Sequence, residues 1–154
     1  MYALKTGCQW AALPSEYPDY RRVHYYFMLW QKHKIFDKIL KQLVIEKRKQ
    51  NGKNLQTSFG IIDAQSVKNT DTAKEKGYDA GKKISGIKRH IVVDTNGLPH
   101  GIYVTTANIT DREGAIELVK KNKKFYLKWN VFSVMEATQD PILLTKLKKL
   151  LEQI

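Results

Sequence analysis

SFGIIDAQSVK, at residues 58–68, contains a short apolar run that ends on one carboxylate, Asp63. Apolar residues without helical spacing are typical of a strand that is buried on both faces of a sheet, so we predict a strand that ends at Asp63. At the end of a strand, a rigid sheet can hold a carboxylate toward solvent and a metal ion. An aspartate that only caps a turn is the alternative, and this stretch alone favours it.

Two further strands are predicted downstream, at Lys88–Thr95 and Leu98–Thr106. The Asn96-Gly97 dipeptide between them is a strong signal for a hairpin turn. Asn69–Ser85 lies between the first and second strands, and its polar, glycine-containing sequence predicts a loop or excursion. After residue 57 the sequence therefore changes from a helical to a strand-and-turn pattern.

A helix is predicted from Asp111, which can cap its N-terminus. Asp94 directly precedes the hairpin, and we predict a structural role for it as well. Three antiparallel strands followed by a helix form the opening of a ribonuclease-H-like fold, in which the first strand carries the first metal-binding carboxylate. This order of elements therefore favours Asp63 as a metal ligand more than its local sequence does.

Residues 1–50 are predicted to be helical and are rich in aromatic side chains. A first helix is expected at Tyr2–Trp10, and Asp19 is a suitable N-cap for a second helix. Arg21 and Arg22 would face outward from short helices, in the manner of a helix-turn-helix unit on DNA. A plain helical bundle with a solvated basic face is the alternative, and the aromatic side chains are expected in its core.

The 154-residue chain carries 27 lysine and arginine residues against 15 acidic residues, a formal net charge of +12. Its apolar fraction of 42% is sufficient for a folded core. Positive charge recurs along most of the chain, which favours nucleic acid as a partner over a merely solvated basic surface. Cys8 is the only cysteine, which excludes an intramolecular disulfide and a cysteine-based zinc site. A reducing, intracellular setting is consistent with this single cysteine, and the sequence shows neither an apolar run long enough to cross a membrane nor a signal-peptide pattern.

A series of sequence blocks extends from Tyr2 to about Ala115. The blocks are Lys5–Trp10 with Leu13-Pro14, Asp63–Lys68, Gly77–Lys83, Lys88–His90, Val93–Thr95, Ala107-Asn108 and Asp111–Gly114. In their order and spacing they resemble the DDE-class transposases of bacterial insertion sequences, in the IS-four/IS-five group. Such an ordered series is far more specific than any single short motif.

The resemblance implies phosphoryl transfer on DNA, in which three carboxylates hold two divalent metal ions. Mg²⁺, or Mn²⁺, suits ligation by oxygen atoms alone. Asp63 would be the first of the three carboxylates, and therefore both a catalytic residue and a metal ligand. The residues expected near DNA phosphates are Arg21, Arg22, Lys68, Lys82, Lys83, Lys88, Arg89 and His90. The implied partner is the element's terminal inverted repeats in the bacterial cytoplasm, with a second copy or full-length transposase as further partners.

The resemblance stops after about Lys124. The family places a second Asp, followed by Gly-Gly-Tyr, on the next strand and a Glu further downstream, but the sequence at that position is Met135-Glu136-Ala137-Thr138. When the reading frame of the codons for residues 134–141 is moved one base earlier, the genetic code permits the sequence Asp-Gly-Gly-Tyr-Ser-Gly. We therefore expect a truncated or frameshifted transposase. Asp140-Pro141 nevertheless opens an amphipathic C-terminal helix, which is unusual for out-of-frame sequence.

The predicted fold class is α+β, with four segments. They are a helical DNA-binding region at 1–50, a polar linker at 51–57, an incomplete ribonuclease-H-like domain at 58–124 and a divergent tail at 125–154. The missing strands would leave an exposed sheet edge, which favours aggregation. With one of three carboxylates, the chain should bind metal weakly or not at all and cleave DNA poorly.

Three functions remain open at this point. In the first, the chain is an inert descendant of a transposase. In the second, it is a non-catalytic DNA-binding regulator of transposition, and in the third it is an active nuclease. The nuclease hypothesis requires Asp63 to act together with Glu136 or Asp140.

Overall fold

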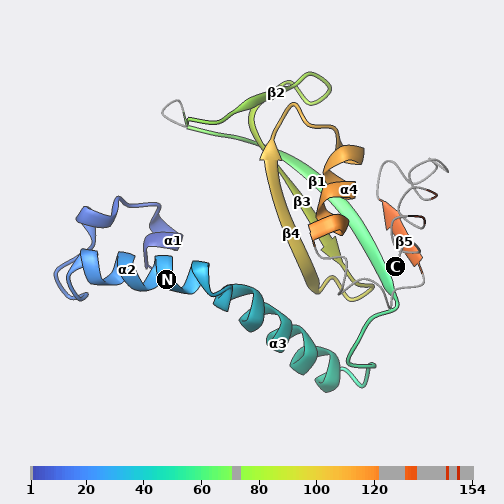
Figure 1. Ribbon diagram of the computed structural model, residues 1–154, viewed down its shortest axis with the longest axis horizontal. Helices are drawn as coiled ribbons and strands as arrows, with labels where there is room; N and C mark the ends of the chain where they lie inside the picture. Colours follow the sequence, from blue (N-terminus) through green and yellow to red (C-terminus); the bar gives the residue numbers. More distant parts are fainter. Residues whose placement is uncertain (1, 71–73, 122–130, 135–144, 146–148, 150–154) are drawn as a thin grey trace. The chain divides into compact units, whose positions relative to one another are not determined.

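The computed structural model describes residues 2–70, 74–121, 131–134, 145 and 149. They belong to two compact units, Met1–Leu43 and Val44–Ile154 (Figure 1). The boundary falls within helix α3, Ile35–Gln50. The predicted C-terminal helix after Asp140 lies almost entirely outside the described residues. No helix in the described part of the chain is long and apolar enough to cross a membrane.

The first unit contains α1 (Tyr2–Thr6), the short 3₁₀ helix η1 (Trp10–Ala12), α2 (Tyr20–Lys32) and the beginning of α3. The prediction that one helix continues to Trp10 is wrong. The helix stops at Thr6 because Gly7 adopts a left-handed φ of +67°, a conformation that ends helices. Asp19 caps α2 as predicted, since its Oδ1 accepts a hydrogen bond of 2.9 Å from the Arg21 N–H.

Aromatic side chains of the first unit pack against one another. The ring centre of Phe27 lies 5.3 Å from that of Trp10 and 5.8 Å from that of Phe36, which in turn lies 6.0 Å from Trp30. These rings line an apolar pocket of about 430 Å³. None of residues 2–43 is fully buried, so the expected aromatic core is a partly exposed cluster.

The second unit is built on a sheet. Its strands are β1 (Phe59–Lys68), β2 (Gly77–Asp79), β3 (Ile84–Val93), β4 (Pro99–Thr106) and β5 (Val131–Val134). Strand β3 is central and antiparallel to its neighbours, with β1 along one edge and β2 and β4 along the other. Strand β5 runs parallel to β1 on the outer edge of β1, where Val134 pairs with Ile62.

The predicted strands differ from the observed ones at two ends. Strand β1 does not end at Asp63, because its pairing with β3 continues as far as Lys68, which lies opposite Gly86. The polar Ser66 is tolerated inside the strand because its hydroxyl donates a hydrogen bond of 2.6 Å to Asp79. Pairing with β2 starts β3 at Ile84, opposite Asp79, so both β2 and the beginning of β3 lie within what was expected to be a loop.

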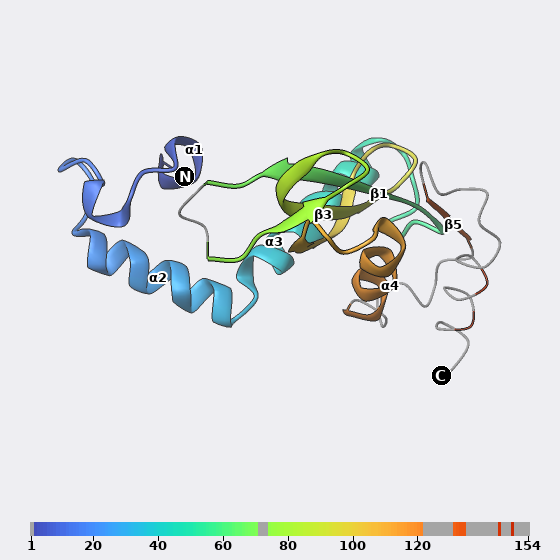
Figure 2. The ribbon, with the colours of Figure 1, turned by 90° about the horizontal axis from the view of Figure 1, so that it is seen from above.

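Helix α4 (Asp111–Lys121) lies on one face of the sheet (Figures 1 and 2). Its buried Leu118 and Val119 belong to the same core as Ile62 and Val92. The helix begins where predicted, but Thr110, rather than Asp111, is its cap. The Thr110 hydroxyl and the Thr110 N–H both donate hydrogen bonds to the Glu113 carboxylate. In turn, the Glu113 N–H donates a hydrogen bond of 3.2 Å to the Thr110 hydroxyl oxygen.

The predicted hairpin joins β3 to β4, with Gly97 at a φ of +73°. Asp94 shapes this turn, because its Oδ1 accepts hydrogen bonds of 2.8 Å from the Asn96 N–H and 3.1 Å from the Leu98 N–H. The structural role predicted for Asp94 is therefore confirmed. Its other carboxylate oxygen is engaged by Arg48 and lies 3.3 Å from His100 Nε2.

Arg48 fixes the end of α3 to the sheet. Its guanidinium is buried, bonds the Asp94 carboxylate and donates a further hydrogen bond of 2.7 Å from Nε to the Asn54 carbonyl. A weaker bond of 3.4 Å reaches the Gln56 carbonyl. The segment after α3 is thus bonded to the helix that precedes it.

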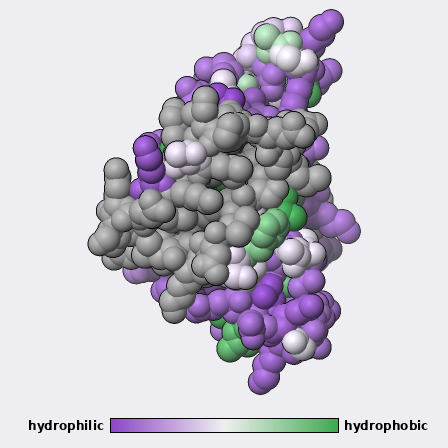
Figure 3. All heavy atoms as spheres, turned by 90° about the vertical axis from the view of Figure 1, so that its right-hand side faces the viewer, coloured by the Kyte–Doolittle hydropathy of each residue, from purple (hydrophilic) through white to green (hydrophobic). Residues whose placement is uncertain are grey.

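In the view of Figure 3, most of the described surface is hydrophilic, with small hydrophobic areas.

Candidate active site and nucleic-acid interface

Asp63 lies in the middle of β1, on the sheet face that points away from α4. Side chains alternate between the two faces of a strand. Ala64 pairs with His90, whose ring packs against the α4 backbone at Gly114, so the neighbouring Asp63 belongs to the opposite face. Asp63 is exposed there and lines an open pocket of about 480 Å³. The pocket is lined by Asp63, Ala64, Gln65, Lys82, Arg89, Ile91 and Ile102.

Lys82 reaches the backbone beside Asp63. Its ammonium donates a hydrogen bond of 3.1 Å to the Ala64 carbonyl and lies 3.4 Å from an Asp111 carboxylate oxygen. The Ala64 N–H donates a bond of 2.8 Å to Asp63 Oδ1. The turn between β2 and β3 is thereby connected to the candidate catalytic strand and to the start of α4.

Arg89 is the second cation of the pocket. It lies opposite Gln65 in the β1–β3 pairing, and its Nη2 donates a hydrogen bond of 2.7 Å to Gln65 Oε1. A guanidinium has five N–H donors, so this bond leaves others for a further acceptor. Because Lys82 also lies against Asp111, Arg89 is the cation of the pocket whose remaining donors suit a phosphate group.

Lys88 belongs to a buried network of charged side chains. Only 4% of Lys88 is exposed, and its ammonium lies 3.0 Å from Asp79 and 2.8 Å from Asp111. The Ser66 hydroxyl, the Lys88 ammonium and the Lys82 N–H together hold the pKa of Asp79 well below its usual value, with Ser66 the largest cause. Burial lowers the pKa of Lys88, but the carboxylates of Asp111 and Asp79 more than offset burial and leave it raised.

His90 is fully buried, with Nε2 3.0 Å from the Thr105 hydroxyl. A Cβ added at Gly114 would collide with the imidazole ring, so the ring occupies the space that the glycine leaves open on α4. Burial lowers the pKa of His90 by more than the nearby Asp111 carboxylate raises it, and the ammonium groups of Lys88 and Lys82 also lower it. His90 and Lys88 thus lie inside the described fold, where their contacts are structural.

Acid should destabilise the fold in two stages. Burial lowers the pKa values of His90 and His100 below 6.5, so the unfolded chain binds their protons first and stability falls as the pH drops below that value. The pKa values of Asp79 and Asp94 lie below 3.8, so their contribution is present above that pH and is lost in stronger acid. Urea unfolding midpoints measured from pH 8 down to about pH 3 test this expectation. A midpoint that stays constant below pH 6 would contradict it.

The other residues predicted to approach DNA lie on the surface. Lys68 ends β1, and Lys83 lies in the turn between β2 and β3 with a φ of +53°. Both are exposed, as are Arg21 and Arg22 on α2 of the first unit. Of the predicted cations, the structure thus brings Lys82 and Arg89 to the pocket of Asp63.

Sequence reasoning did not identify the partners of these lysines. Asp79 and Asp111 lie in the sequence blocks quoted above, yet no local pattern shows that both pair with Lys88. Ser66 meets Asp79 only because the excursion between β1 and β3 folds back onto β1. The one available signal was that Asp79 is the one carboxylate between Lys76 and Lys88 in the sequence.

The described residues do not supply the donor set of a two-metal site. Asp63 is the one acidic side chain that lines the pocket, and two-metal phosphoryl transfer requires several oxygen ligands around the two ions. Within the ranges that the structure describes, no group of three or more His, Cys, Asp or Glu side chains is arranged to hold a metal ion. Glu136 and Asp140 lie outside those ranges.

Comparison with protein families gives two matches that together cover most of the chain. Residues 54–132 match the family described as "Transposase DDE domain". Residues 1–40 match the family described as "Putative transposase of IS4/5 family". The first match extends beyond Lys124 to the beginning of β5. No curated protein and no solved structure matches the chain.

Proposed function

Because the chain belongs to the transposase DDE-domain family, we propose that it binds DNA at the pocket of Asp63, with Asp63 as the family's first catalytic carboxylate. The observation that carries this proposal is that one exposed carboxylate lines the same open pocket as two cations, Lys82 and Arg89. Such cations position a DNA strand by its phosphates without reading its sequence. The terminal inverted repeats of the element are the proposed target.

The sheet supports a ribonuclease-H-like domain as the scaffold. Its first long strands are antiparallel and are followed by α4, and β5 then adds in parallel beside β1. The family places its second carboxylate on the next strand, which in this chain is β5. The residues that follow Val134 in the sequence are Met135 and Glu136, where the family has Asp-Gly-Gly-Tyr.

We therefore propose DNA binding without efficient strand cleavage, which is the role of a non-catalytic regulator of transposition. The donor set of the pocket supports this role, since it holds one carboxylate among the described residues. In the complete family site, a divalent cation would activate the nucleophile and stabilise the leaving group. The coding sequence beyond the codon of Lys120 tests the frameshift hypothesis directly. An open frame one base earlier that encodes Asp-Gly-Gly-Tyr would support it.

Asp63→Asn is expected to retain DNA binding and to tighten it about fivefold at low salt, because it removes one negative charge, or about 1 kcal/mol, next to bound phosphates. Fluorescence anisotropy with a mixed-sequence DNA duplex measures the affinity, and gel analysis with Mg²⁺ or Mn²⁺ measures cleavage. We expect little or no cleavage by either protein.

Two outcomes would contradict the proposal. An affinity that does not change with salt concentration would argue against phosphate contacts. Metal-dependent cleavage by the wild-type chain that disappears in Asp63→Asn would instead show a complete active site and favour the nuclease hypothesis with Glu136 or Asp140.

A further inference from the structure

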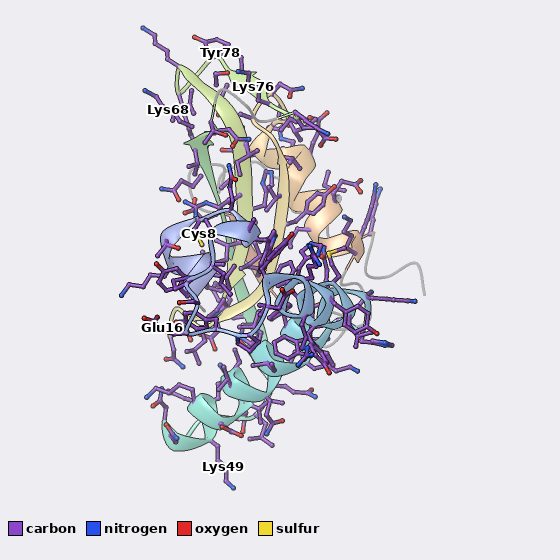
Figure 4. All side chains as sticks on the ribbon, turned by 90° about the vertical axis from the view of Figure 1, so that its left-hand side faces the viewer. Cys8, Glu16, Lys49, Lys68, Lys76 and Tyr78 are labelled. Carbon is purple, nitrogen blue, oxygen red and sulfur yellow. The ribbon has the colours of Figure 1, made fainter. Side chains whose placement is uncertain are left out.

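We propose that the second unit carries a separate DNA contact, which we call the basic ribbon, formed by residues 66–70, 74–79 and 84–86. Its exposed Lys68, Lys74, Lys76 and Tyr78 would bind the phosphates and sugars of a duplex beside the segment that occupies the Asp63 pocket. This inference rests on the proposed function and extends it to a second surface. Figure 4 shows Lys68, Lys76 and Tyr78 together at one end of the unit, opposite the end that carries Lys49.

The base of the ribbon is closely packed. Gly77 and Gly86 lie opposite each other in the β2–β3 pairing. A Cβ at Gly86 would collide with the Val67 carbonyl, and a Cβ at Gly77 would collide with the Asn108 side chain. The strands can approach this closely only because both residues lack a side chain. The base of the ribbon is therefore preorganised for binding.

The ribbon has one carboxylate that is bonded within the fold and several lysines on its exposed, outer surface. Asp79 turns inward, where it is bonded by Ser66 at 2.6 Å and paired with Lys88 at 3.0 Å. Its negative charge is thus neutralised within the fold. The side chains of Lys68, Lys74 and Lys76 are exposed, and the structure gives none of them an ion pair with a described acidic residue.

This arrangement leaves the outer side of the ribbon positive. Glu75 is the one carboxylate that the described ribbon exposes, against three lysines. The acidic residue that could have opposed them, Asp79, is used internally. A cluster of three lysines against one carboxylate is complementary to the regular phosphates of duplex DNA.

The register places the ribbon within reach of a duplex held at Asp63. Tyr78 pairs with Ser85, and Asp63 pairs with Ile91, six residues further along β3. Residues an even number apart share a face of the sheet, so Tyr78 and Asp63 lie on the same face. Six residues of strand span at most about 20 Å, roughly the length of six base pairs. One duplex can therefore contact the pocket and Tyr78 together.

The test compares two triple variants of equal charge. The ribbon variant is Lys68→Ala, Lys74→Ala and Lys76→Ala, and the control is Lys47→Ala, Lys49→Ala and Lys53→Ala at the opposite end of the same unit. Anisotropy titrations with a fluorescein-labelled mixed-sequence DNA duplex at several KCl concentrations give the slope of log K against log [salt]. Circular dichroism and thermal unfolding check that each variant is folded, which we expect because all six side chains are exposed.

The ribbon variant should reduce the magnitude of the slope by about 2.7, because each phosphate contact contributes about 0.9. The control should change it by less than about 1. Tyr78→Ala should weaken binding at every salt concentration without changing the slope, since tyrosine is not a cationic side chain that displaces counterions from DNA.

The remaining outcomes separate the two proposals. An unchanged slope in the ribbon variant, with normal binding by the wild-type chain, would overturn the ribbon and leave the pocket proposal standing. Equal changes in both triple variants would show an effect of net charge alone and would also overturn it. Failure of the wild-type chain to bind the duplex would overturn both proposals.

Discussion

Replacing Arg48 by methionine should lower the free energy of unfolding by about 3–5 kcal/mol, because it leaves the buried Asp94 carboxylate without its charged partner. The side chains of Arg48 and Asp94 are 7% and 0% exposed, so water cannot replace the lost contact. The loss also frees the Asn54 carbonyl, which accepts the Arg48 Nε hydrogen bond. Urea unfolding followed by circular dichroism gives the free energy.

A matched control and a double variant make this test specific. Lys47→Met, one residue earlier on the exposed side of α3, should cost less than about 0.5 kcal/mol. Asp94→Asn removes the charge but keeps the oxygen that shapes the hairpin, so adding it to Arg48→Met should restore part of the stability. A loss below about 1 kcal/mol for Arg48→Met alone would mean that His100 can compensate Asp94 by itself.

The second large effect is expected for Gly114→Ala. The added methyl group would enter the space of the His90 ring, which is fully buried between the sheet and α4. Overpacking of this kind costs about 1–3 kcal/mol, and this site should lie at the upper end because the ring has no exposed side toward which to move. Thermal and urea unfolding measure the loss.

Gly81→Ala provides the matched glycine control. A Cβ there would meet only Asp79 Oδ1, at an ordinary contact distance of 3.5 Å, so little change in stability is expected. His90→Ala opens the space that the new methyl group needs, so Gly114→Ala should cost much less in that background. Equal costs of Gly114→Ala with and without His90 would rule out the predicted collision.

Local features of the fold could be predicted from sequence where one or two residues determine them. Asp19 caps α2 through its own side chain, and Asn96-Gly97 allows the left-handed backbone of a hairpin. Both signals are contained within a few residues. The position of Asp63 on the first strand was identified for the same reason, because an apolar run precedes it directly.

Features that depend on distant residues were not predictable. Strand β1 continues past Asp63 only because β3 pairs with it, and β3 lies in a separate stretch of the sequence, beyond the excursion that follows β1. Lys88 was expected near DNA, as a lysine in a basic segment would be, but its surroundings are set by Asp79 and Asp111 from two other elements. Arg48 gave no sequence signal that separates it from the exposed Lys47.

The bonds at Ala64 also bear on the free edge expected from a sheet that lacks later strands. In the described residues, pairing of β1 with β5 ends at Ile62, so the outer side of β1 beyond it has no neighbouring strand. Ala64 nevertheless has both backbone groups occupied, its N–H by Asp63 and its carbonyl by Lys82. An incoming strand would have to displace both charged side chains before it could pair. Asp63 and Lys82, two residues of the proposed DNA pocket, thereby also protect this part of the strand edge from pairing with a second strand.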